Sequence, residues 1–435
     1  MSHELEKSPR TAGITQGAVI ILASILPVMG VVLISPIAPL LKAAFENQPG
    51  GSYLAAAALT APALAVAVCS PMVGALIDRI GARRMLITAL LAYALIGIAP
   101  LWLDSLPTLI IARLALGIAE AVILTANLAL LAGYFEGQRR SRWIAYQTSA
   151  AALGATGLYI LGGVLGQVGW RAPFAAYGVS GLIALAAAIA LFEPSRTVAV
   201  RSYSPARRLG IMTLVNVLVL CVVTVLSAVM FYVIPIQFAV LLAEVGVKSS
   251  AQFGFLIAIA GLGNPVGAFA FRFVSRIPTS LIMGVAGGVA AIGLGLVAIA
   301  DALPLVVAGA FINQIGCGIF VPAMAAATMQ ALPPERRGIG GGSWVTSFFS
   351  GQFLSPLFVE LMINTAHGVR GGFVYLALAT LVVGIAAAAV LVLVGRSSIA
   401  RQWSVPDGTT VTAQIIMAPN SQKRDRALRT SSESR

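Results

Sequence analysis

The chain has 435 residues, of which 59% are hydrophobic and only 10% are charged, and its formal net charge is +13. Because an ordinary soluble domain carries about 25% charged residues, this composition excludes a soluble globular protein. It indicates a chain that lies in a lipid bilayer, so the placement of the positive charges becomes informative.

The apolar stretches are long and continuous, and polar residues do not alternate with them at every second position. A bilayer core of ~30 Å needs about 20 apolar residues per helix, and only helices or closed barrels satisfy the backbone in lipid. The sequence therefore predicts an all-α membrane protein. Its turns and charges predict twelve transmembrane helices, near residues 17–41, 53–77, 85–103, 107–133, 143–167, 172–192, 209–238, 250–271, 279–300, 304–330, 339–364 and 371–395.

Polar segments divide these helices into two groups of six. Residues 1–16 are expected to form a cytoplasmic tail without a cleavable signal, and residues 396–435 a basic tail that is expected to be disordered. The longest internal polar stretch is a predicted linker at 193–208. It separates an N-terminal six-helix bundle (17–192) from a C-terminal one (209–395).

The basic residues sort to one side of the predicted spans. Twenty-three lie in the tails and alternate loops that share one side, whereas four lie on the other side, Lys42, Arg171, Lys248 and Arg370. The positive-inside rule then places both termini in the cytoplasm, which requires an even number of spans. The net charge therefore reflects topology in a cytoplasmic membrane, and nucleic-acid binding is not expected.

Short sequence motifs recur in the two halves in the same order. Asp104–Pro107 opens the fourth span and Asp301–Pro304 opens the tenth, 197 residues later. Arg171–Phe174 opens the sixth span and Arg370–Phe373 opens the twelfth, 199 residues later. Such parallel repeats predict pseudo-symmetric halves with a substrate site between them, near the middle of the bilayer.

One charged motif lies between the second and third spans. It resembles the loop signature Gly-x-x-x-Asp-Arg-x-Gly-x-Arg-Arg of the major facilitator superfamily, which this sequence matches at Gly74, Asp78, Arg79, Gly81, Arg83 and Arg84. The resemblance covers residues 15–395 and implies a secondary transporter in which this loop is a latch between the halves. Asp78 would then face the start of span eleven at Gly338–Ser343. The alternative is that the cluster only sets topology.

Span four supports the resemblance and carries the charges inside the membrane. Arg113 and Gly117 resemble a family signature in this helix, whereas the Gly-Pro of the family's antiporter motif is absent near Leu158 and Tyr159. Arg113, Glu120 and Asn127 recur every seven residues, so they form a polar stripe on one helix face.

Buried charges are costly and mark functional sites. Arg113 and Glu120 are separated by ~10 Å along the helix, too far for a direct ion pair. We expect Glu120, with Arg113, to bind protons or substrate, because burial favours the neutral acid. The alternative is a structural pair that neighbouring polar groups such as Gln147 satisfy. Glu360, toward the outer end of span eleven, is expected to be a rim residue.

Other polar side chains within the spans are candidates for the central cavity, although many such groups only bond between helices. The predicted cavity residues are Arg113, Glu120, Asn127, Gln147, Asn216, Asn264, Asn313, Gln314 and Gln352. The aligned position of Glu120 in the second half is Cys317, so proton coupling is expected in the first half alone.

The sequence does not indicate an enzyme, a metal site or a cofactor. The chain has two histidines and three cysteines that lie far apart, and it lacks an ATPase signature. The resemblance implies a monomeric secondary transporter of a small molecule, coupled to protons. Efflux is favoured by the sparse acids and apolar cavity. Uptake of an organic anion by proton symport is the alternative that Arg113 and the missing Gly-Pro support, and a receptor with a transporter fold is the third.

Overall fold

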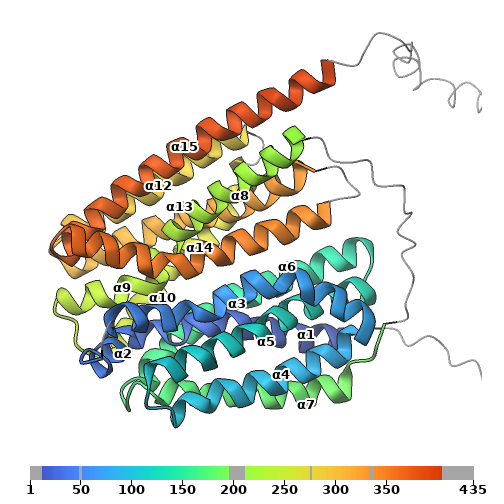
Figure 1. The fold of residues 1–435 in the computed structure, drawn as a ribbon, viewed down its shortest axis with the longest axis horizontal. Helices are drawn as coiled ribbons and strands as arrows, with labels where there is room; N and C mark the ends of the chain where they lie inside the picture. The colour runs from blue at the N-terminus through green and yellow to red at the C-terminus, as the bar shows by residue number, and fades with distance from the viewer. Residues whose placement is uncertain (1–11, 49–50, 195–210, 275–276, 333–336, 404–435) are drawn as a thin grey trace, which may run out of the picture. The chain divides into compact units, whose positions relative to one another are not determined.

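The structure is a computed structural model that describes residues 12–48, 51–194, 211–274, 277–332 and 337–403. Within these ranges the chain forms helices and turns without strands, and Figure 1 shows the helices as coiled ribbons. The all-α fold class is therefore confirmed. Residues up to Leu391 form one compact unit, and a second unit begins at Val392. The predicted tails and linker lie mostly outside the described residues.

The first half begins with a span in three pieces, α1 (Ile14–Val32), the 3₁₀-helix η1 (Ser35–Ile37) and α2 (Ala38–Ala44). The next spans follow the predicted ranges closely. They are α3 (Gly51–Ile80), α4 (Ala82–Ile98) with η2 (Ala99–Leu101), α5 (Leu106–Tyr134), α6 (Gly137–Leu165), and η3 (Ala172–Gly178) with α7 (Val179–Ala190).

The second half repeats this layout. Its helices are α8 (Ile211–Phe231), α9 (Val233–Glu244), α10 (Ser250–Gly261), α11 (Gly263–Val274), α12 (Thr279–Ile299), α13 (Leu303–Gln330), α14 (Arg337–Thr365) and α15 (Val369–Trp403). Of the described residues, 11 helical segments are long and apolar enough to cross a membrane. α14 has 29 residues but is richer in glycine and hydroxyl side chains, and it completes the twelve. α15 continues past its predicted end at residue 395.

The first and seventh spans break at equivalent positions. α1 ends shortly before Pro36, and α8 ends shortly before Pro235, because proline removes a backbone N–H from the helix ladder. The two breaks also touch, since the Ser35 hydroxyl donates a hydrogen bond to the Pro235 carbonyl. The pseudo-symmetric halves therefore meet where their leading helices are interrupted.

The repeated sequence marks form the same ion pair in each half. Arg171 lies 2.5 Å from Asp104, and Arg370 lies 2.6 Å from Asp301. We call the end of the bundle that carries these pairs the arginine-poor end. The opposite end, with the α3–α4 and α5–α6 turns, is the arginine-rich end, since the spans alternate in direction.

Glycines allow close helix packing inside each half. On α12, Gly293 lies against the backbone of Gly309 and Asn313 on α13, so an added Cβ would stand 2.6 Å from the Gly309 carbonyl oxygen. Gly295, two residues further along the same helix, has open space where its Cβ would be. The two positions therefore differ in packing but share a helix and a depth.

We expect Gly293→Leu to lower the thermal unfolding temperature of the purified protein, because overpacking a tight interface costs about 1–3 kcal/mol. Gly295→Leu is the matched control and should leave that temperature nearly unchanged. Equal unfolding temperatures of the two variants, measured by fluorescence-detected melting, would contradict this account of the α12–α13 interface.

Candidate functional site

The predicted polar stripe on α5 is buried along its whole length. Arg113, Glu120 and Asn127 are exposed by 1%, 3% and 0%. α5 begins at a Ser105 N-cap, whose hydroxyl oxygen accepts a hydrogen bond from the Thr108 N–H. The helix has 29 residues with no proline beyond its first turn, so its hydrogen-bond ladder holds the three side chains at successive depths.

Arg113 satisfies backbone carbonyls that two neighbouring helices leave without partners. Its Nε donates to the Ala58 carbonyl at 3.2 Å. Pro62 stands four residues after Ala58 in α3 and has no N–H to occupy that carbonyl. A second guanidinium N–H donates to the Gly30 carbonyl near the end of α1, and a third to the Tyr177 hydroxyl at 2.9 Å. Arg113 thus joins α1, α3, α5 and η3.

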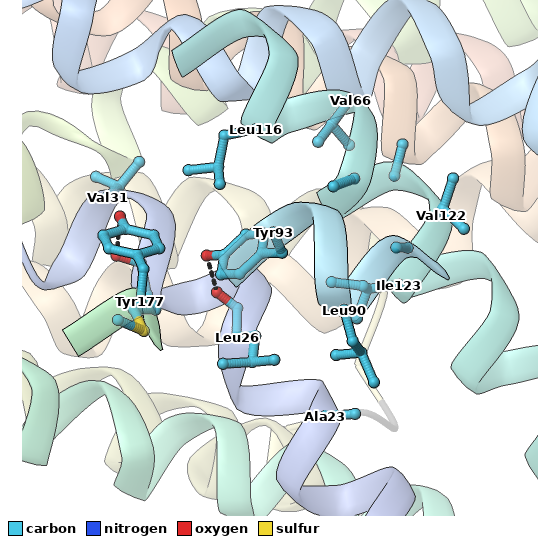
Figure 2. Packing of buried hydrophobic residues seen from close by; sticks show 14 of the residues in the cluster. Ala23, Leu26, Val31, Val66, Leu90, Tyr93, Leu116, Val122, Ile123 and Tyr177 are labelled. Carbon is cyan, nitrogen blue, oxygen red and sulfur yellow. Dashed lines mark hydrogen bonds between the residues drawn. The ribbon is translucent and has the colours of Figure 1, made fainter. Parts of the chain in front are cut away.

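Glu120 lies directly against α1. A Cβ added to Gly30 would overlap the Glu120 carboxylate, so only glycine leaves room for it. The Tyr93 hydroxyl of α4 lies 3.4 Å from Glu120 Oε1 and 2.6 Å from the Leu26 carbonyl oxygen. Figure 2 shows the Tyr93–Leu26 bond beside Tyr177, whose hydroxyl reaches the next turn of α1 at Met29.

The two buried charges do not form an ion pair with each other. Among the described residues, ion pairs within 4.0 Å are those of Lys42 with Glu360, Arg171 with Asp104 and Arg370 with Asp301. This agrees with the separation expected from their spacing on one helix. The side chain that shares a hydrogen bond with Glu120 is the Tyr93 phenol, not the Arg113 guanidinium.

A central cavity of about 270 Å³ lies between the two halves. Most of its wall is apolar or aromatic, and the polar groups in it are two amides and a few hydroxyls. Its lining comes from α1, α6, the α8–α9 break, the α10–α11 break and α13, through Val28, Val31, Val32, Ala151, Ala152, Ala155, Thr156, Tyr159, Phe231, Tyr232, Pro235, Gly261, Asn264, Pro265 and Gln314.

The predicted cavity residues divide into groups. Asn264 and Gln314 line the cavity. Asn313 instead turns toward α12, where its Nδ2 donates to the Ala290 carbonyl at 2.9 Å, while its Oδ1 accepts from Gln314 Nε2. The remaining predicted residues are not part of this lining, namely Arg113, Glu120, Asn127, Gln147, Asn216 and Gln352.

Two of these residues carry buried polar atoms without a protein partner. Both side-chain polar atoms of Asn127 and the Oε1 of Gln352 are of this kind. Asn216, by contrast, is buried and engaged.

Aromatic residues of the site were missed by the sequence reasoning. Phe348 on α14 stacks on Trp344 and meets Phe231 and Tyr232 edge-on or tilted, with ring centroids 5.2 to 5.5 Å apart. Two of these rings line the cavity. In an apolar span an aromatic residue that faces a cavity has the same sequence signal as one that packs, so only the fold separates them.

The halves contact each other near the arginine-poor end. Lys42 Nζ lies 3.0 and 3.1 Å from the two carboxylate oxygens of Glu360, and the Glu360 side chain is only 7% exposed. Asn364 donates to the Tyr53 hydroxyl nearby at 2.6 Å. The predicted rim residue Glu360 therefore belongs to an ion pair that ties α2 of the first half to α14 of the second.

Deeper in the membrane, α3 and α14 exchange two reciprocal hydrogen bonds. The Thr60 hydroxyl of α3 donates to the Phe353 carbonyl, and the Thr346 hydroxyl of α14 donates to the Ala67 carbonyl. Donor and acceptor are seven residues apart on each helix, as antiparallel packing requires. Ala67 has a free carbonyl because Pro71 stands four residues later.

At the arginine-rich end, the charged motif is tied to its own half. Glu193 accepts hydrogen bonds from the Ala82 and Arg83 N–H groups at the start of α4. Arg83 in turn donates to the Leu191 and Ala188 carbonyls at the end of α7. Gly81 makes the turn with a φ of 104°, which favours glycine.

The proposed latch surface is accessible in this conformation. Asp78, Arg79 and Arg84 are exposed, and a Cβ added to Gly74 would meet open space. Gly340, at the start of α14, packs instead against Thr328 and Met329 of α13. The hydrogen bonds of Ala82 and Arg83 lie within the first half, Asp78 makes a further contact, and the latch role of the motif stays a prediction.

These features define a multi-pass membrane protein with a central cavity between two helical halves. The sequence profile of the Major Facilitator Superfamily matches residues 20–302 and 220–428, and the chain belongs to this superfamily of membrane transporters. The resemblance seen in the sequence is thereby confirmed.

Named relatives include resistance proteins. The class C tetracycline resistance protein of Escherichia coli is 30% identical over 37% of this chain and 41% of its own length. The class G tetracycline resistance protein of Vibrio anguillarum is 34% identical over 39% of this chain and 43% of its own length. The chain therefore matches about two fifths of the length of these curated relatives.

Solved structures support the same fold. A D-xylose–proton symporter superposes with a TM-score of 0.74 at 16% identity, covering 87% of this chain and 97% of that one. A bacterial homolog of the human lysosomal transporter Spinster, inward-facing and occupied, gives a TM-score of 0.72 at 17% identity, covering 89% and 98%. At these identities the similarity concerns the fold.

We expect Arg113→Met to lower thermal stability, because each buried carbonyl left without a donor costs about 1–3 kcal/mol. Adding Pro62→Ala restores an N–H for the Ala58 carbonyl, so the double variant should recover part of the loss. Pro71→Ala is the matched control, since the carbonyl that Pro71 frees is occupied by Thr346, and it should not rescue. Purely additive effects in a double-mutant cycle of unfolding temperatures would contradict the assignment.

Proposed function

We propose that this protein is a proton-coupled exporter of small amphipathic organic compounds, and that Glu120 binds the coupling proton. The observation that carries the proposal is the Glu120 carboxyl group, buried in the middle of a membrane-spanning helix against α1. A charge at the centre of a transmembrane helix costs ~2.5–3.5 kcal/mol on insertion scales, so a carboxyl group at this position indicates a functional site. Reversible protonation is the role that its chemistry offers.

The surroundings of Glu120 favour a proton over a metal ion or an anion as its ligand. Tyr93 is the polar side chain beside it, and Arg113 is engaged by the carbonyls of Ala58 and Gly30. The guanidinium that supported uptake of an organic anion is thus occupied by the protein's own backbone. This favours export over anion symport.

The cavity supports an amphipathic substrate. Its wall is mainly aliphatic and aromatic, and Asn264, Gln314 and Thr156 are neutral polar groups that could orient a ligand. The named relatives are resistance proteins for tetracycline, and tetracycline is therefore the first compound to test. Because one chain supplies the whole cavity, we propose that it works as a monomer.

We propose transport by alternating access, with the arginine-rich end and both termini in the cytoplasm. The contacts of Lys42 with Glu360 and of Tyr53 with Asn364 link the halves at the arginine-poor end. Gly74 has open space beside it toward the arginine-rich end. We assign this arrangement to a state that is open to the cytoplasm. The latch formed by the charged motif would close in the opposite state.

Glu120→Gln should abolish proton-driven accumulation, because the amide keeps the size but cannot release a proton. The substrates for this test are chosen by a resistance screen that includes tetracycline. A compound is used if expression of this protein protects a host that lacks its own exporters. Everted vesicles with an imposed pH gradient then measure accumulation, and substrate-driven proton movement gives the direction of coupling. Glu244→Gln, at an exposed acid, is the control. Full accumulation by Glu120→Gln would refute the assignment.

Exchanging the two charges of the Lys42–Glu360 ion pair should preserve transport. Lys42→Glu or Glu360→Lys alone should slow transport and shift the protein to the state in which the arginine-poor end is open. Breaking a partly buried pair costs about 1–4 kcal/mol, between the values of exposed and fully buried pairs. The double reversal should restore transport. Reversing Arg171 and Asp104 tests an ion pair at the same end but within one half, and neither single change there should shift the conformation.

A further inference from the structure

We propose that Tyr93 is the positioning residue that couples the protonation of Glu120 to the first helix, by moving its hydroxyl hydrogen bond between the Leu26 carbonyl and the Glu120 carboxylate. The inference rests on the proposed role of Glu120 and deepens it. It assigns a coupling role to a side chain of α4 that contacts neither the cavity nor the charged motif.

The geometry around the hydroxyl carries the proposal. Tyr93 is fully buried, and its oxygen lies 2.6 Å from the Leu26 carbonyl oxygen and 3.4 Å from Glu120 Oε1. A phenol has one proton to donate, so it serves one of these acceptors well at a time. The shorter distance makes Leu26 its main acceptor in this structure.

The charge on Glu120 decides which acceptor is better. A carboxylate accepts hydrogen bonds about twice as strong as those of a neutral acceptor, so an ionised Glu120 competes for the Tyr93 proton. A protonated Glu120 no longer competes and can instead donate to the phenol oxygen. Uptake of a proton therefore favours the Tyr93–Leu26 bond, and its release weakens that bond.

Leu26 is where such a change would matter for α1. It directly precedes Pro27, which interrupts the helix ladder, and Gly30, one turn later, lies against the Glu120 carboxylate. The same helix continues into the broken segment at Ser35, which touches Pro235 in the other half. A bond made or lost at Leu26 thus acts on the helix that connects the buried acid to the contact between halves.

The other titratable groups near Glu120 are few. Arg113 of α5 donates to the Gly30 carbonyl of α1 and to the Tyr177 hydroxyl of η3, so both side chains lie near the Glu120 site. Tyr232 of the second half lies within electrostatic reach of Glu120. α1 has no titratable side chain, and between residues 54 and 77 α3 contributes Cys69 alone. Tyr93 is the group among them that contacts both Glu120 and α1.

The test separates proton binding from conformational response and needs no substrate. Infrared difference spectra of the purified full chain follow the carbonyl band of protonated Glu120, identified by its loss in Glu120→Gln. Spin labels at Trp102 and Ile299, which are 70% and 72% exposed near the arginine-poor end of each half, report the separation of the halves against pH. Labelling uses a background in which Cys69, Cys221 and Cys317 are replaced by alanine.

We expect Tyr93→Phe to keep the titrating carboxyl band but to lose most of the pH-dependent shift in the spin-label distances. Tyr134→Phe is the matched control, because its hydroxyl also donates to a backbone carbonyl, that of Phe192, away from Glu120. It should keep both signals.

Other outcomes overturn specific claims. A full pH-dependent distance shift in Tyr93→Phe would overturn the coupling role. Loss of both the distance shift and the carboxyl titration in this variant would overturn it as well. A pH-dependent shift that survives in Glu120→Gln would instead overturn the proposed proton site, whatever Tyr93 does. If Tyr93→Phe fails to fold, the tyrosine C–O stretching mode of the unmodified chain decides, since it must change in step with the carboxyl band.

Discussion

The architecture depends on one constraint, that a carbonyl released inside a membrane must find a donor within the protein. Proline creates such carbonyls at Ala58 and Ala67 in α3. Arg113 occupies the first from within its own half, and Thr346 occupies the second from the opposite half. The two prolines of one helix thus create attachment points, one for a side chain of the same half and one for a side chain of the opposite half.

This view changes the meaning of the buried arginine. A guanidinium in the membrane suggests a ligand for an anionic substrate, and its position in span four supports that interpretation. The structure instead surrounds Arg113 with the carbonyls of Ala58 and Gly30 and the Tyr177 hydroxyl. Its positive charge then serves the fold, and Glu120 remains the buried carboxyl group to which we assign proton binding.

The halves share a topology but differ in chemistry at equivalent positions. Glu120, Gly30 and Tyr93 correspond to Cys317, Ser227 and Ala290, each 197 residues later. Cys317 and Ala290 are smaller than their counterparts, and all three residues line a small, mostly apolar cavity of about 30 Å³ inside the second half. The duplicated scaffold therefore retains room where the first half holds its acid, and the second half has no carboxyl group at this position.

The sequence by itself determined the twelve spans, the paired marks Asp104 and Asp301, and the polar stripe on α5, because these follow from length, hydropathy and helical period along one chain. It also predicted Asn264 and Gln314 as cavity residues. It could not determine that Asn313 turns away, that Tyr159 and Tyr232 face the cavity, or that Tyr93 joins Glu120 to Leu26. Those contacts join helices far apart in the chain. Only the packing of the bundle decides which face of an apolar helix meets a cavity and which meets a neighbour.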